Sequence, residues 1–164
     1  MQAKDAIRQS MEMSDMVMGK YLEDLDDAAF LRRPVEGMNH IAWQVGHLIS
    51  TERGTIEAIE PGSSPALPEG FDAKHGKETH SVDDPGQFYT KDEYLAFWKA
   101  QREATRSVLD SLSDADLDAP APERVRSFCP TVGHAMNMFG GIHPMMHAGQ
   151  FVAVRRSLQK PVAF

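Results

Sequence analysis

Four stretches of the chain carry apolar side chains at the three- and four-residue spacing of a single helix face. They cover about residues 2–25, 39–60, 90–112 and 131–158. No run of alternating β-branched residues indicates a sheet. The sequence therefore predicts an all-α chain in which each helix buries one face against the others, as in a four-helix bundle.

Polar and helix-breaking residues indicate where the predicted helices begin and end. We expect Asn39 to be the N-cap of the second helix and Pro61 to end it, while Thr90 and Glu93 match a capping box at the start of the third. The stretch from Pro61 to Tyr89 holds four prolines and four glycines and has no sustained periodicity. We interpret it as a long crossover between helices two and three that can carry short turns.

Length and charge narrow the class of protein. A chain of 164 residues suits one domain, so we expect residues 1–164 to form a single unit. The formal net charge of −7, without any Lys/Arg cluster longer than a pair, argues against a nucleic-acid partner. Cys129 is the one cysteine, which fits a reducing compartment. No stretch approaches the roughly 20 apolar residues of a membrane span, so we expect a cytoplasmic protein without a membrane partner.

Two of the seven histidines are spaced to act together on the last helix. His143 and His147 lie four residues apart, about 40° around one helix face, where two imidazoles can chelate one ion. His47, among apolar neighbours on the second helix, can be a core histidine with one hydrogen bond, but three helical histidines facing one core favour a metal site. His134 should point away from the pair, and His40 should lie at the rim, about 10 Å from His47 along the helix.

Two familiar metal motifs are absent from the sequence. A zinc-protease helix would read HExxH, but Pro144, Met145 and Met146 separate the two histidines. A di-iron bundle needs ExxH pairs, and no Glu is followed by His three residues later. Pro144 also removes a backbone donor and predicts a kink, which the glycines at 140 and 141 would ease.

The segments NHIAWQVGHLIS and HPMMHAGQFVAVRR resemble the DinB superfamily of four-helix proteins, whose members often carry GHL on the second helix and HxxxHxGQ on the last. The resemblance implies three metal ligands at His47, His143 and His147, with nickel or zinc as the ion. Gly149 and Gln150 match the GQ dipeptide of the family. Members are commonly dimeric, some are thiol S-transferases or isomerases that use low-molecular-weight thiols such as bacillithiol or mycothiol, and many have no assigned activity.

Three neutral imidazoles leave one or two open positions on a divalent ion, which is typical of a catalytic site. Such a position can hold water or a thiolate sulfur, and the resemblance favours the thiolate. We therefore predict a metal-dependent enzyme of thiol-transfer type that acts on a small electrophile. A metal-dependent hydrolase is a near variant, and a non-catalytic metal-binding or stress-related interaction protein is the alternative. Gln150, on the same stripe as His143, can orient a ligand or simply pack between helices.

Aromatic side chains gather at the start of the third helix. Tyr94, Phe97 and Trp98 share one face, and Phe88 and Tyr89 extend the apolar surface beyond the helix start. Either the core and the crossover cover this patch, or part of it is shared with a second copy of the chain. The dimeric habit of the resembling family favours a homodimer.

Overall fold

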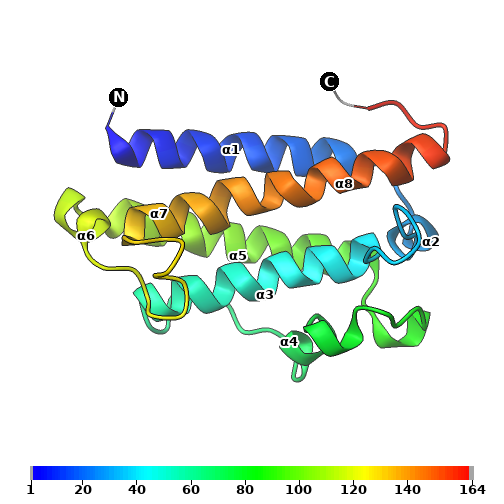
Figure 1. Cartoon of the computed structure of the whole chain (residues 1–164), viewed down its shortest axis with the longest axis horizontal. Helices are drawn as coiled ribbons and strands as arrows, with labels where there is room; N and C mark the ends of the chain where they lie inside the picture. The colour runs from blue at the N-terminus through cyan, green and yellow to red at the C-terminus, as the bar shows by residue number, and fades with distance from the viewer. Residues whose placement is uncertain (1, 163–164) are drawn as a thin grey trace.

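In the computed structural model, which describes residues 2–162, four long helical segments lie side by side (Figure 1). No strand occurs among the described residues, and the predicted all-α bundle is confirmed. The long segments are α1 (Ala3–Leu22), α3 (Ile41–Ile59), α5 (Lys91–Ser111) and a last rod formed by α7 (Val132–Asn137), the π-helical turn η3 (Met138–Ile142) and α8 (His143–Ser157).

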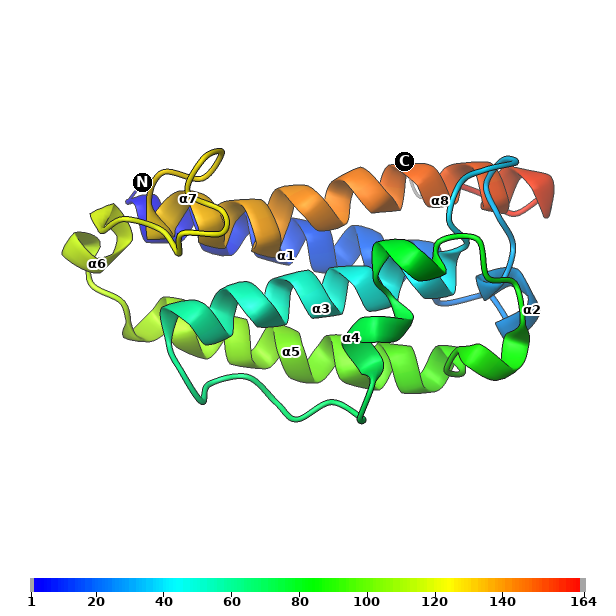
Figure 2. The ribbon, with the colours of Figure 1, turned by 60° about the horizontal axis from the view of Figure 1, so that its bottom comes forward.

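The long crossover determines the direction of the helices. Figure 1 shows α1 and the last rod running one way, and α3 and α5 running the other. Because α3 and α5 are consecutive long helices that run in the same direction, the chain between them must travel back along the bundle. On that path it forms α4 (Phe71–Lys74) and two single turns of 3-10 helix, η1 (Lys77–Thr79) and η2 (Pro85–Gln87). Figure 2 shows this segment lying over α3 and α5.

Two further short helices complete the chain, α2 (Asp27–Phe30) after α1 and α6 (Asp114–Asp118) after α5. The capping box predicted at the start of α5 is present, with the Glu93 carboxylate accepting from the Thr90 N–H at 2.8 Å. None of the described helices is long and apolar enough to cross a bilayer.

The start of α3 differs from the sequence prediction. The N-cap is His40, not Asn39, and its Nδ1 accepts a hydrogen bond from the Trp43 N–H at 3.0 Å. The other ring nitrogen lies 3.2 Å from the Val82 carbonyl of the crossover. His40 is therefore fully buried under the crossover, and the prediction that it lies at the rim was wrong.

The last rod bends where Pro144 removes a backbone donor. The His143 N–H donates to the Met138 carbonyl, five residues back, which gives one π-helical turn. Pro144 cannot donate to Gly140 four residues back. The Ser14 hydroxyl of α1 lies 3.0 Å from that carbonyl and 2.8 Å from the Met11 carbonyl, so the two carbonyls share its proton. Gly141 lets α1 approach this turn, because a Cβ there would lie 1.9 Å from the Ser10 Oγ.

The crossover covers the aromatic patch at the start of α5. Phe71 of α4 stacks on Tyr89 with ring centroids 5.5 Å apart and packs edge-on against Phe97 at the same distance. Tyr94 and Trp98 are buried in the main apolar cluster of the bundle. Of the two readings of the patch, the structure shows cover by the core and the crossover. The predicted homodimer is not tested by this finding and stays a prediction.

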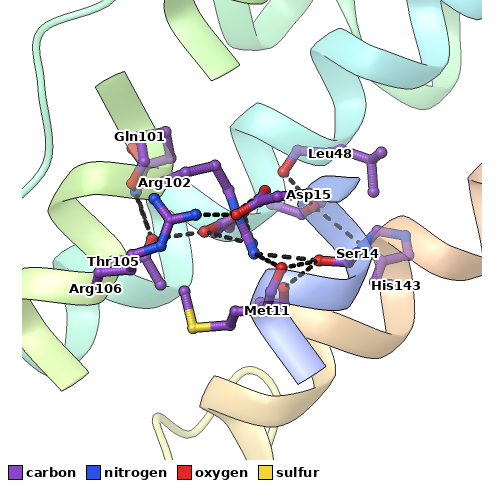
Figure 3. A network of polar contacts seen from close by, with 12 residues as sticks. Met11, Ser14, Asp15, Leu48, Gln101, Arg102, Thr105, Arg106 and His143 are labelled. Carbon is purple, nitrogen blue, oxygen red and sulfur yellow. Dashed lines mark hydrogen bonds and ion pairs between the residues drawn. The ribbon is translucent and has the colours of Figure 1, made fainter. Parts of the chain in front are cut away.

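A buried guanidinium joins three of the long segments (Figure 3). Arg102 of α5 is 1% exposed, and its Nη1 donates to both carboxylate oxygens of Glu52 on α3 at 3.1 Å. Its Nε donates to Asp15 of α1 at 2.8 Å, and its Nη2 donates to the Met11 carbonyl and the Ser14 hydroxyl at 3.2 Å. Since Ser14 also bonds to the last rod, one connected network reaches all four segments.

The same network satisfies the buried acid. Burial raises the pKa of Glu52, while the charge of Arg102 and a 2.6 Å hydrogen bond from the Thr105 hydroxyl oppose that rise. Removing either charge would leave the other inside the bundle without a partner, which is the costly case for a buried ion pair.

We expect Arg102→Met to lower the free energy of unfolding by about 3–5 kcal/mol, because Glu52 would stay buried without a counter-charge. Arg106→Met is the matched control, since Arg106 also pairs with Asp15 but is 39% exposed, and it should cost less than about 1 kcal/mol. Urea denaturation measures both. Equal losses in the two variants would contradict the role given to Arg102.

Candidate metal centre

The three predicted ligands come together in the fold. His47 lies on α3, and His143 and His147 lie one turn apart on α8, with one ring nitrogen of each within 4.8 Å of the others. The Nε2 atoms of His143 and His147 are 3.2 Å apart. All three side chains are partly buried between α3 and the last rod. The structure therefore contains a cluster of imidazoles that can hold a metal ion.

The tautomer of His147 follows from its neighbour Gln44. The Gln44 side-chain N–H donates to the Asn39 carbonyl at 2.6 Å, which turns the amide oxygen toward His147. The His147 Nδ1 lies 2.7 Å from that oxygen and must carry the proton of the hydrogen bond. In the neutral ring, Nε2 is then left with a lone pair that faces His143.

His143 contacts Thr51 on its other side. The Thr51 hydroxyl donates to main-chain carbonyls one turn back on α3, with that of His47 at 2.9 Å. Its oxygen also lies 3.5 Å from the His143 Nδ1, a long contact. The Nε2 lone pair of His147 faces the His143 Nε2 across 3.2 Å.

This separation fits a shared ion. Two nitrogens on a tetrahedral zinc ion, each bound at 2.0–2.1 Å, lie roughly 3.3 Å apart. Without a cation or a shared proton, two lone pairs at this distance repel. The donor chemistry and the spacing of His143 and His147 therefore fit a metal ion, and His47 is near enough to supply a third nitrogen.

The crossover holds the third imidazole. The His47 ring lies parallel to the Trp43 indole, with centroids 5.0 Å apart and planes 8° apart. The indole N–H in turn donates to the Thr79 hydroxyl of η1 at 3.1 Å. The stacking partner of His47 is thus fixed by a residue of the crossover that is distant in the sequence.

His75, whose role the sequence leaves open, fastens the crossover to α3. Its Nδ1 lies 2.7 Å from the Phe71 carbonyl and its Nε2 2.7 Å from the Tyr94 hydroxyl. The ring lies directly on Gly46, where an added Cβ would be 2.2 Å from a ring carbon. Burial lowers the pKa of His75 to about 4, so the ring is a neutral packing group at ordinary pH.

Burial also keeps the three clustered imidazoles neutral. It lowers the pKa of His143 to about 4 and of His147 to about 3, and in both cases the neighbouring histidines add to the effect. The pKa of His47 is lowered as well, again mainly by burial. A neutral imidazole is the form that binds a metal, so the site is ready for ligation well below neutral pH.

A model of the DinB superfamily matches residues 11–151, which make up most of the chain and include the three histidines. The chain belongs to the DinB superfamily. No curated protein and no solved structure matched it. The resemblance stated from the GHL and HxxxHxGQ patterns is thereby confirmed at the level of the family, and the histidines of both patterns form the cluster in this DinB superfamily member.

Two polar residues beside the proposed ligands were not among the predicted site residues. Gln44 and Thr51 lie three residues before and four residues after His47, so they share its helix face. Helical spacing could have found them. The contact between His75 and Gly46 could not be found this way, because it joins the crossover to α3 and no helical spacing relates the two residues.

Gln150 and Cys129, which were also considered from the sequence, lie in different surroundings. Gln150, three residues after His147, is partly buried, and its side chain makes no hydrogen bond to any residue of 2–162. Its predicted role toward a ligand stays a prediction. Cys129 is 2% exposed and packs with Val125 and Phe139, and burial raises the pKa of its thiol. It therefore has the surroundings of an inert core cysteine.

A large cleft near one end of the bundle does not coincide with the histidine cluster. A cleft of about 680 Å³ opens where the C-terminal ends of α3 and α5 meet α6, and its ionisable lining residues are Glu60 and Asp116. It includes none of the three histidines. We place the candidate site at the histidine cluster because its donor atoms converge.

We expect Gly46→Ala to destabilise the protein by about 1–3 kcal/mol, because the new methyl group would overlap the His75 ring. In a His75→Ala background the same change should cost nothing or stabilise slightly, since alanine favours the helix. Chemical denaturation of the four proteins in this double-mutant cycle measures the coupling.

Gly19→Ala on α1 is the control, because its Cβ would meet no atom within 4 Å, and it should stabilise by roughly 0.5–1 kcal/mol. If Gly46→Ala costs the same with and without the His75 ring, the ring does not pack on Gly46 as described.

Proposed function

We propose that His47, His143 and His147 bind one divalent transition metal ion, zinc or nickel, and that the protein is a metal-dependent enzyme of thiol-transfer type acting on a small electrophile. One observation carries the metal site: ring nitrogens of all three histidines lie within 4.8 Å of one another, and the Nε2 atoms of His143 and His147 are 3.2 Å apart. Membership in the DinB superfamily supports the thiol chemistry through the resemblance described above.

The residues of the chain prepare the ligands for this role. Gln44 holds the tautomer that turns the Nε2 lone pair of His147 inward, and Trp43 stacks on His47 and fixes the plane of its ring. A divalent ion on three neutral imidazoles keeps an open position and lowers the pKa of a thiol that binds there. We assign Gln150 the role of orienting that thiol or its substrate.

The composition of the cluster favours an enzyme over a purely structural site. Structural zinc sites are closed by four protein ligands, whereas catalytic sites keep three and leave a position open. Within residues 2–162, the group of converging donor atoms contains the three imidazoles and no carboxylate or thiol. A fourth protein ligand, found in the metal-loaded protein, would favour the non-catalytic alternative.

We expect His143→Ala to abolish stoichiometric metal binding, because two imidazoles alone hold a divalent ion weakly. His134→Ala is the matched control, since it removes an exposed imidazole from the same rod that should point away from the site. Elemental analysis of the purified proteins gives the metal-to-protein ratio. If His143→Ala retains the ratio of the parent, the assigned ligands are wrong.

The pH dependence of binding should differ from that of free imidazoles. A ring with the ordinary pKa of about 6.5 loses metal to protons between pH 7 and pH 5. Because burial holds His143 near pKa 4 and His147 near 3, protons compete only at lower pH, and affinity should change little from pH 7 to pH 6 and fall steeply as pH approaches 4. A competition titration measures this. A steep loss centred on pH 6.5 would show that the rings are not buried as described.

A further inference from the structure

The segment between α6 and α7 brings a positive charge to the edge of the histidine cluster. Figure 1 shows this segment, coloured yellow, reaching from the last rod to α3. Its Arg124 donates through Nη2 to the Thr51 carbonyl at 3.1 Å and to the Thr55 hydroxyl at 2.6 Å. Thr51 is the residue whose hydroxyl contacts His143. The guanidinium therefore lies next to an α3 residue that contacts a proposed ligand.

The position of Arg124 depends on a glycine. Gly54 lies under the guanidinium, and an added Cβ would be 3.2 Å from Nη2. His47, Thr51 and Gly54 follow one another at helical spacing on α3, so the guanidinium lies on the same stripe as the ligand. Together these residues form one wall of the site, with the ligands of α8 opposite.

Some of the N–H groups of Arg124 make no hydrogen bond within residues 2–162. Its contacts to α3 use Nη2 alone, which leaves the N–H groups of Nη1 and Nε without a partner among residues 2–162. No carboxylate in that part of the chain lies within 4.0 Å of it, whereas Arg102 pairs with two carboxylates and Arg155 with one. Free guanidinium N–H groups are suited to bind a carboxylate, sulfonate or phosphate.

The segment does not need Arg124 to hold its shape. Ala121, Val125 and Cys129 are buried and pack against the last rod. The Ala121 N–H donates to the Pro130 carbonyl at 3.1 Å, and the Arg126 Nε donates to the Ala121 carbonyl at 2.8 Å. These contacts hold the segment without Arg124, whose own two hydrogen bonds reach α3.

Exposed apolar side chains also lie close to the histidine cluster. Phe128 is 57% exposed, and its ring packs against Phe139, which in turn lies edge-on to His143 with centroids 5.9 Å apart. Met146, also 57% exposed, lies three residues after His143 on α8. The edge of the cluster thus combines exposed apolar surface with one unpaired cation.

We propose that this site recognises a small organic anion, with one donor atom at the metal and a carboxylate or sulfonate group at Arg124. This inference rests on the proposed metal site. The chain carries a net charge of −7, so its overall field repels anions, and a local cation is what would select them.

The test uses two simple thiols that differ in one charge. The nickel-loaded protein is titrated with 2-mercaptoethanesulfonate and with 2-mercaptoethanol, and binding is followed by the sulfur-to-metal charge-transfer absorption. Sulfonate is a poor metal ligand, so a preference for the anionic thiol reports a contact with the protein. We expect about tenfold tighter binding of the sulfonate at low salt, shrinking as salt is added.

Three variants locate the contact. Arg124→Gln should remove the preference while leaving metal content and 2-mercaptoethanol binding unchanged, and Arg124→Lys should keep most of it. Arg126→Gln removes the same charge from the same segment. It also removes the hydrogen bond to the Ala121 carbonyl, but the buried side chains of the segment remain, so it should keep the preference. Preference that persists in Arg124→Gln, equal binding of the two thiols by the parent, or no thiol binding to the metal-loaded protein each overturn the inference and leave the metal site standing. A parent protein that binds no metal overturns the proposed function itself, and this inference with it.

Discussion

The arrangement of the helices depends on one buried guanidinium. Arg102 meets Glu52 of α3 and Asp15 of α1, and through Ser14 the network continues to the Gly140 carbonyl of the last rod. Burying these charges is expensive, and an apolar core of the same volume would serve stability as well or better. We infer that the network serves to fix the register of the helices relative to one another. Glu52 follows the His47 position by five residues on the same helix, so fixing Glu52 fixes where His47 meets α8.

The same network also supports the π-helical turn of the last rod. Proline at 144 leaves the Gly140 carbonyl without its helical partner, and the hydroxyl of Ser14 satisfies it. The π-helical turn directly precedes His143, so the part of the rod that carries the paired histidines starts from a bend tied to α1. The carbonyl that Pro144 leaves without a helical donor, next to the proposed ligands, thus finds its partner on another helix.

The sequence predicts the bundle and the histidine cluster well, because both follow from helical spacing. Four apolar stripes give four helices, and the four-residue step from His143 to His147 places two rings on one face. What sequence cannot provide is the contact between distant segments. His40 caps α3 in place of Asn39, a better capping residue by type, because Val82 of the crossover bonds to its ring. The packing of His75 on Gly46 is likewise a contact between distant segments that the sequence does not predict.

We propose that three imidazoles, and no sulfur from the chain, bind the metal. X-ray absorption spectroscopy of the metal-loaded protein, without added thiol, tests this set of ligands most directly. For zinc, we expect a shell of nitrogen and oxygen neighbours near 2.0–2.1 Å with the outer-shell scattering of three imidazole rings. A sulfur neighbour at about 2.3 Å, which only Cys129 or a methionine could supply, or scattering from fewer than three imidazoles, would show that the ligand set is wrong.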